Sequence, residues 1–228
     1  RTLSEAVAAA EIVIVAVPDR RIGDVATSAM PHMQTGSLLV CLDPAAPFAG
    51  KIPPREEVAV FVCHPAHPSV FNEELDLEAR FDFFGSGKAR QAIVCALLRG
   101  TETDFQRGEA LAKAMWKPVL RSHRITVEQM AILEPALSET VAATCITVIR
   151  EAMEEAIARG VPADAARDFL LGHLFCELGI IFDRSGFPFS DGAKRAIEDA
   201  KRELFQPDWK KVFTPEAIRK SVAAITDG

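Results

Sequence analysis

The sequence predicts an α/β protein in which a doubly wound, mainly parallel sheet is followed by an all-helical C-terminal part. Three apolar runs indicate the sheet, and they are IVIVAV at Ile12–Val17, SLLVCL at Ser37–Leu42 and VAVFVC at Val58–Cys63. Unbroken runs rich in β-branched residues are typical of strands that are buried on both faces. After Arg124 such runs give way to helical periodicity and capping signals, which predicts a change of architecture there.

Each predicted strand runs into a turn that contains proline. The three turns are Val17-Pro18-Asp19, Asp43-Pro44 and His64-Pro65-Ala66-His67-Pro68. Proline cannot donate to a strand ladder, so it ends each strand and fixes the residues beside it. Because the carboxyl ends of parallel strands meet at one edge of a sheet, we expect the three turns to line a single crevice.

Helices are predicted between and after these strands. Asp19 is expected to cap a helix whose buried face carries apolar residues at helical spacing, namely Ile22, Val25, Ala26 and Ala29. A helix over residues 103–115 and two further strands, over 92–98 and 118–121, complete the expected sheet.

The C-terminal part carries the signals of helix starts and ends. Thr126 and Gln129 fit a capping box, Gly160 is expected to end one helix, and Pro162 and Pro215 are expected to open others. Pro135 is expected to kink or break the helix just after Glu134. We therefore predict two domains, the remainder of a dinucleotide-binding domain over 1–123 and a helical substrate and dimerisation domain over 124–228.

Composition narrows the classes of function. The 228 residues carry a net charge of −6 from dispersed acids, without the basic stripe that nucleic-acid binding requires. The longest apolar runs fall short of the ~20 residues of a membrane span, so no membrane partner is expected. The five widely spaced cysteines indicate reduced thiols and a cytoplasmic protein. The predicted helix over 137–158 is apolar on nearly all sides, which predicts a homodimer formed through the helical domain.

The strand-end turns supply the candidate cofactor contacts. Backbone groups of Val17, Pro18 and Asp19 are placed to approach a dinucleotide, and Asp43 and Pro44 are expected nearer the nicotinamide. His64, at the third strand end, completes the set. The alternative is that these are ordinary rigid turns with capping aspartates.

The histidines of the third turn are the leading acid–base candidates. His64 or His67 could take up the proton released when an alcohol is oxidised, and Glu134 is a further catalytic candidate. Glu134 and His173 are also a candidate pair of ligands for a divalent metal, although no metal-ligand motif is present. The alternatives are a surface loop with incidental histidines and a buried histidine satisfied by hydrogen bonds.

The beginning of the chain departs from a complete dinucleotide fold. No G-x-G-x-x-G turn occurs, the first residue is Arg1, and a strand begins at Ile12. We therefore expect that a preceding strand and its glycine-rich turn are missing from this chain. The choice between NAD and NADP stays open on these residues.

Four segments together resemble the D-apionate oxidoisomerase family, which joins an NAD-binding Rossmann domain to a 6-phosphogluconate-dehydrogenase-like helical domain. They are EIVIVAVPDRRIGDVA, LLVCLDPAAPFAG, VAVFVCHPAHPSVF and ITVEQMAILEPALSETVA. The resemblance implies NAD as cofactor and oxidation of a sugar acid, D-apionate, coupled to carboxylate migration that gives 3-oxo-isoapionate. The His-Pro pair is also similar to that of prephenate dehydrogenases. The alternatives are a simple hydroxy-acid or prephenate-type dehydrogenase and a non-catalytic dinucleotide-binding module.

Overall fold

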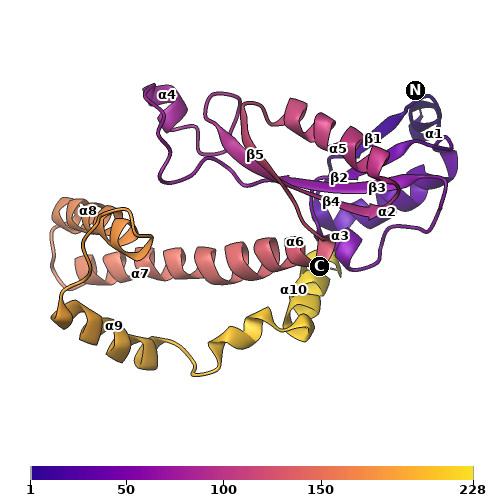
Figure 1. Cartoon of the computed structure of the whole chain (residues 1–228). Helices are drawn as coiled ribbons and strands as arrows, with labels where there is room; N and C mark the ends of the chain where they lie inside the picture. The colour runs from indigo at the N-terminus through magenta and orange to yellow at the C-terminus, as the bar shows by residue number, and fades with distance from the viewer. Residues whose placement is uncertain (1, 228) are drawn as a thin grey trace. The chain divides into compact units, whose positions relative to one another are not determined.

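The computed structural model describes residues 2–227 and contains a five-stranded sheet in the order β1-β2-β3-β4-β5 (Figure 1). The strands are β1 (Ile12–Val15), β2 (Leu38–Cys41), β3 (Ala59–Pro65), β4 (Gln91–Arg99) and β5 (Val119–Arg124). The first three are parallel, β4 runs antiparallel to β3, and β5 is parallel to β4. The predicted α/β class with a largely parallel sheet is confirmed. The third strand extends two residues beyond its predicted end, so His64 belongs to the strand.

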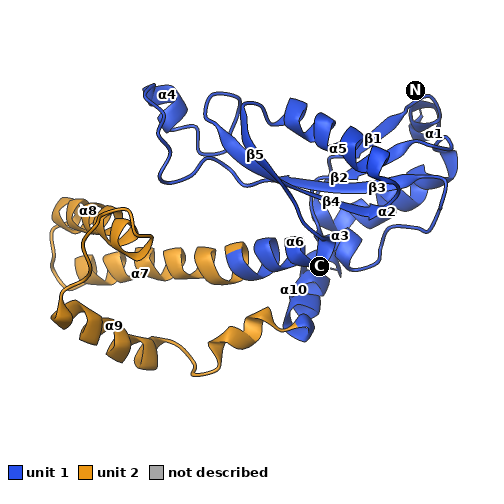
Figure 2. Cartoon of the chain, viewed as in Figure 1, with its two compact units in different colours: residues 1–137, 215–228 blue, residues 138–214 orange. Residues whose placement is uncertain are grey.

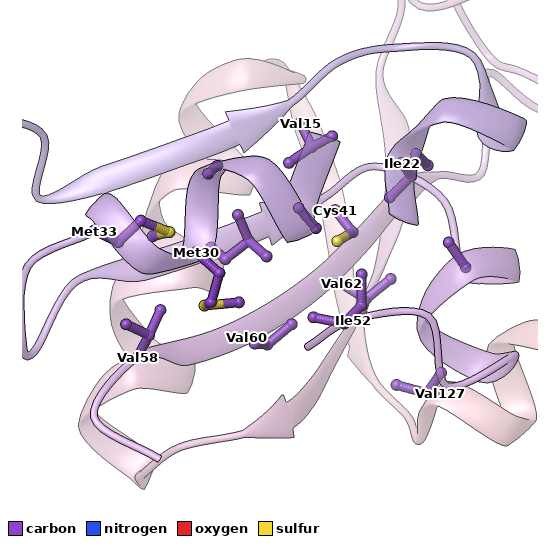
Figure 3. Packing of buried hydrophobic residues seen from close by; sticks show 14 of the residues in the cluster. Val15, Ile22, Met30, Met33, Cys41, Ile52, Val58, Val60, Val62 and Val127 are labelled. Carbon is purple, nitrogen blue, oxygen red and sulfur yellow. The ribbon is translucent and has the colours of Figure 1, made fainter. Parts of the chain in front are cut away.

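Helices cover both faces of the sheet, as a doubly wound arrangement requires. Helix α5 (Glu102–Met115) packs on the face that carries Leu38 and Phe61. The opposite face carries Leu39 and Val60, which pack beneath several helices (Figure 3). Those helices are α1 (Leu3–Ala8), α2 (Asp19–Ala29), the short 3-10 helix η1 (Met30–His32) and α6 (Val127–Ala131). Successive residues of one strand therefore fill two different cores, which explains the unbroken apolar runs.

Helix α2 follows β1 directly and was predicted with its buried face. Ile22, Ala26 and Ala29 are buried as expected, and Gly23 lies beside them. The prediction that Asp19 caps the helix is wrong, because the cap position is Pro18 and Asp19 is the first helical residue. Pro18 has no side-chain acceptor, so α2 begins without a side-chain cap.

The chain divides into two compact units (Figure 2). The first contains Arg1–Leu137 and Pro215–Gly228, and the second contains Ser138–Thr214. This division differs from the boundary predicted after residue 123. Helix α6 stays with the first unit because Val127 and Met130 belong to its core. The last helix, α10 (Pro215–Asp227), returns to pack on α2 and on α3 (Ala45–Phe48).

Pro135 was predicted to kink or break the helix; the chain stays helical there, but regular α-helix gives way to a π-helix around it. The chain continues from α6 into a π-helix, η2 (Ile132–Ala143), which contains Pro135, and then into α7 (Thr144–Ala158). The remaining elements of the second unit are α8 (Ala163–Ile181), α9 (Asp191–Leu204) and the 3-10 helix η3 (Trp209–Phe213). The capping box at Thr126 is confirmed.

This helical stretch is both strongly apolar and largely exposed. The run Val127–Ala158 is 32 residues long and apolar enough to cross a membrane by length and composition, although no membrane partner was expected. One helix of this kind is weak evidence, because the core helix of a soluble protein passes the same test. Within residues 138–214, only Ala166 and Gly179 are buried. The second unit therefore has almost no core of its own.

Replacing Gly108 of α5 by alanine should destabilise the protein. A Cβ atom at Gly108 would lie 2.5 Å from ring atoms of Phe61, which is fully buried. Such overpacking typically lowers the free energy of unfolding by about 1–3 kcal/mol. Denaturant unfolding checks this against the control Gly172→Ala in α8, where nothing lies within 4 Å and stability should hold or rise slightly. Equal stability of the two variants would contradict the packing described.

Candidate active site

Three side chains from distant parts of the chain meet at the carboxyl edge of β2 and β3. Asp43 follows β2, His64 lies near the end of β3, and Glu134 projects from the π-helix η2. All three belong to the first compact unit. One ligand atom of each lies within 4.8 Å of the others. We call these three residues the carboxylate–histidine cluster.

Both ring nitrogens of His64 face oxygen atoms. Nδ1 lies 2.8 Å from the carbonyl oxygen of Leu42, and Nε2 lies 3.0 Å from Oε2 of Glu134. A carbonyl oxygen can only accept, so Nδ1 donates its proton to Leu42 and the neutral ring then has none at Nε2. The carboxylate of Glu134 therefore requires a positive centre at Nε2. A second proton on the imidazole or a bound cation can supply it.

The surroundings of His64 favour its protonated form. Burial of the ring opposes the charge, but the hydrogen bond to Glu134 and the charge of Glu134 outweigh burial and raise the pKa of His64 above its ordinary value. The side chains of His64 and Glu134 are only about a quarter exposed, so solvent screens the pair weakly.

Burial acts in the other direction on the neighbouring carboxyl groups. It raises the pKa of Asp43 to about 6, although the backbone N–H of Ala45 donates to Oδ1 at 2.7 Å and opposes the shift. Burial and the nearby charge of Glu134 also raise the pKa of Asp19. Three carboxyl groups thus lie near one imidazole, and positive charge on His64 favours ionisation of Asp19 and Asp43.

His67 lies near the cluster but in a different setting. Its ring centroid is 6.1 Å from that of His64, and its Nδ1 lies 3.1 Å from the carbonyl oxygen of Phe84. The backbone of His67 has φ +59°, a left-handed conformation that is uncommon for residues other than glycine, although histidine is among those that adopt it more often. Strained backbone of this kind is concentrated at functional sites.

The structure brings most of the predicted site residues to one edge. Val17, Pro18 and Asp19 follow β1, and Pro44 follows Asp43 at the end of β2. Asp19 lies close enough to influence the charges of His64 and Glu134. Sequence reasoning placed Asp43 with the cofactor and missed its approach to His64 and Glu134. Its position directly after a buried strand was the available signal.

His173 occupies a different part of the molecule. It lies on α8 in the second unit, where Nδ1 is 2.8 Å from the carbonyl oxygen of Phe169 and the ring stacks on Phe169 at 3.9 Å. The contacts of Glu134 described above, with His64 and Asp43, lie within the first unit. The pairing of Glu134 with His173 as metal ligands therefore stays a prediction.

Comparison with known proteins identifies the family. A family model described as phosphogluconate dehydrogenase (decarboxylating) C-term matches residues 72–226. A D-apionate oxidoisomerase from Rhizobium rhizogenes is 51% identical over 98% of this chain and 82% of its own length. One from Blautia hydrogenotrophica is 36% identical over 98% of this chain and 78% of its own length. The chain belongs to the D-apionate oxidoisomerase family.

A solved structure extends the likeness to the fold of the family. A semialdehyde dehydrogenase NAD-binding protein from Cupriavidus necator, crystallised in complex with calcium and NAD, is 49% identical. Its TM-score is 0.96, with 99% of this chain and 82% of that chain covered. A ketol-acid reductoisomerase from an uncultured archaeon, at 16% identity and a TM-score of 0.67, shares the fold. The family resemblance read from the sequence is therefore confirmed.

Replacing Glu134 by glutamine should lower the pKa of His64. The variant keeps a similar shape but removes the charge of Glu134, which raises the pKa of His64, while burial continues to oppose the imidazolium. Titration of the imidazole C2–H signal by NMR measures the shift. The control is Glu128→Gln, an exposed residue of α6, which should leave the signal unchanged. An unchanged pKa in Glu134→Gln would show that the pair does not govern His64.

Proposed function

We propose that this protein oxidises D-apionate with NAD as hydride acceptor and couples the oxidation to migration of the carboxylate, giving 3-oxo-isoapionate. The observation that carries the proposal is the carboxylate–histidine cluster at the carboxyl edge of the sheet, where such folds bind dinucleotides and substrates. The chain is 51% identical to a relative named for this reaction. An acid–base group beside the expected nicotinamide position is what oxidation of an alcohol requires.

The turns that follow β1 and β2 fit the cofactor. Val17, Pro18 and Asp19 would approach one part of NAD, and Asp43 and Pro44 another. Helix α2 starts at this edge without a side-chain cap, so N–H groups of its first turn are open to an oxygen of a ligand. When bound, NAD supplies the acceptor for the hydride that leaves the carbinol carbon.

His64 is proposed as the base that receives the hydroxyl proton. As the alcohol becomes a ketone, its carbon loses a hydride and its oxygen loses a proton, which would move to Nε2 of His64. Glu134, 3.0 Å from Nε2, would then stabilise the imidazolium, and Leu42 would hold the ring in place. His67 is the second candidate for proton transfer, since its ring lies beside that of His64.

The cluster also fits a divalent cation, which would take the place of the proton at Nε2 of His64 and leave His67 to receive the hydroxyl proton. Asp43, His64 and Glu134 would hold it, since imidazole and carboxylate are ligands that such cations accept and the three donor atoms already converge. A bound cation supplies Lewis acidity, which polarises the ketone oxygen and thereby assists the shift of the carboxylate. This donor set replaces His173 by Asp43 and His64 as partners of Glu134.

We further propose a cytoplasmic homodimer formed through the helical part. The chain exposes 14519 Å². A monomeric protein of its mass is expected to expose roughly 10,000 Å². The second unit contributes strongly to the difference, because nearly all of its apolar side chains reach solvent. Light scattering tests this: a mass equal to the 24.8 kDa of one chain would exclude the dimer.

Incubation with D-apionate and NAD should produce NADH, detected at about 340 nm, and a rearranged oxo acid, identified by mass spectrometry and NMR. His64→Ala should lower kcat by about 10²–10⁴-fold, the usual contribution of a positioned acid–base group. His32→Ala, at the end of η1, is the matched control and should retain activity. NADH with an unrearranged product would indicate a simple or prephenate-type hydroxy-acid dehydrogenase. NAD binding without turnover of sugar acids would indicate a binding module.

Removing Asp43 from the cluster should weaken binding of a divalent cation. Isothermal titration with Ca²⁺ and with Mn²⁺ measures the affinity, and we expect Asp43→Asn to lower it by about 10–100-fold or more. Asp24→Asn, an exposed acid of α2, is the control and should bind as the wild type does. Equal affinities for the two variants would place the cation elsewhere or show that the cluster holds only a proton.

A further inference from the structure

Residues 66–90 form a long excursion between two strands that are direct neighbours. Strands β3 and β4 are antiparallel and paired as far as Pro65 and Ile93. A hairpin turn of about two to five residues would join such strands. The chain instead builds a segment that includes α4 (Leu77–Arg80) and extends beyond the sheet (Figure 1). We call residues 66–90 the arm.

The arm is an ordered structure with its own hydrogen bonds. The carboxylate of Asp82 accepts from the backbone and the hydroxyl of Ser86, and from the backbone N–H groups of Lys88 and Ala89, at 2.7–3.1 Å. Nε2 of Gln91 donates to the carbonyl oxygen of Gly85 at 3.0 Å. These bonds hold the arm in one conformation. The exposure of its side chains is therefore a feature of an ordered segment.

The arm displays large apolar side chains to solvent. Their exposure runs from 62% for Phe81 to 99% for Leu75, and the set is Val70, Leu75, Leu77, Phe81, Phe83 and Phe84. A phenylalanine normally buries most of its surface, and clustered exposed aromatics mark interaction sites. Three phenylalanines within four positions on a rigid segment therefore require a partner surface.

The second unit offers a hollow that suits such side chains. A cavity of about 550 Å³ lies along α7 and α8, lined chiefly by apolar groups that include Met153, Ala156, Phe169 and Leu170. Its size falls within the range of pockets that bind apolar ligands. The same chain therefore carries exposed apolar side chains on the arm and an apolar cavity on α7 and α8.

We propose that the arm of one copy docks by Phe81, Phe83 and Phe84 into the α7–α8 cavity of a second copy. The proposal rests on the homodimer of the proposed function and names the residues that form it. The exposed area of the chain exceeds that of a typical monomer by far more than the ~800 Å² that one partner contributes to a standard interface. A second copy is the occupant that can cover both surfaces at once, because in a two-fold dimer each arm meets the other copy's cavity.

Docking of the arm would also affect the residues beside the carboxylate–histidine cluster. The carbonyl oxygen of Phe84 lies 3.1 Å from Nδ1 of His67, and the ring of His67 lies beside that of His64. A partner copy that holds Phe84 would therefore hold His67 as well. The order of this second candidate for proton transfer would then depend on the dimer.

Photo-crosslinking tests the contact directly. A benzoylphenylalanine placed at Phe83 of unlabelled full-length protein is mixed with ¹⁵N-labelled wild-type protein, and the exchanged dimers are irradiated. We expect crosslinks to ¹⁵N peptides from residues 144–181. The same probe at Leu3, an exposed residue of α1, is the control and should not reach those peptides. Crosslinks only to unlabelled peptides, which come from the same chain, or only to other regions would overturn the proposal.

A second experiment removes the apolar side chains. The triple variant F81S/F83S/F84S should raise the dissociation constant of the dimer by at least about 100-fold, as for loss of several central anchors, while L3S leaves it unchanged. Circular dichroism verifies that the variant is folded. If the variant does not fold, the crosslinking experiment alone tests the proposal. A monomeric wild type would refute the dimer itself. A dimeric wild type with an unaffected triple variant would refute only the arm contact, and arm-dependent flotation with phosphatidylglycerol vesicles would assign the arm to a membrane instead.

Discussion

The approach of Glu134 to His64 is the interaction on which the candidate site depends. Strand β3 carries His64 to the sheet edge, and the hydrogen bond from Nδ1 to Leu42 turns the other ring nitrogen toward Glu134. Glu134 reaches it from a π-helix, a form of helix that occurs frequently at functional sites. The interaction thus connects the sheet with the start of the long helical stretch inside one compact unit. Loss of either partner would leave a partly buried polar group without its partner.

The same arrangement imposes an electrostatic constraint. Asp19, Asp43 and Glu134 cannot all be ionised around a neutral imidazole without mutual repulsion, and burial of Asp43 and Asp19 already raises the pKa of each. A proton on His64, a cation or a substrate with a developing positive charge relieves that repulsion. The site therefore has a built-in preference for states that bring positive charge to Nε2. Uptake of a proton from an alcohol is such a state, which connects the geometry with the proposed chemistry.

The sequence predicted local features such as turns and helix starts, but it did not predict contacts between residues that are far apart in the chain. The proline turns located the ends of the first two strands to within two residues, since proline restricts its own neighbours, but the third strand continues through Pro65. They did not show that β4 runs antiparallel or that α10 returns to the first unit, because pairing and packing depend on residues far apart in the chain. Asp43 and Glu134 are far apart in the chain, so nothing local predicted their meeting at His64, although the position of Asp43 after a buried strand placed it at the same edge of the sheet. Pro135 was expected to kink or break the helix because a proline inside a helix costs a hydrogen bond, and the chain accommodates it in a π-helix without ending the helical stretch.

The exposed helical stretch Val127–Ala158 is suited either to a membrane or to a protein partner, and its charged residues distinguish between the two. A membrane would surround all of the stretch, including Arg150, Glu151 and Glu154, and ionisable groups are costly in hydrocarbon unless they line a polar interior. The i,i+4 pair of Arg150 and Glu154 is instead suited to a water-facing side of the helix. A protein partner covers one side of a helix and leaves the other to solvent. The coexistence of charged and apolar residues on α7 therefore favours a second copy of this chain over a bilayer.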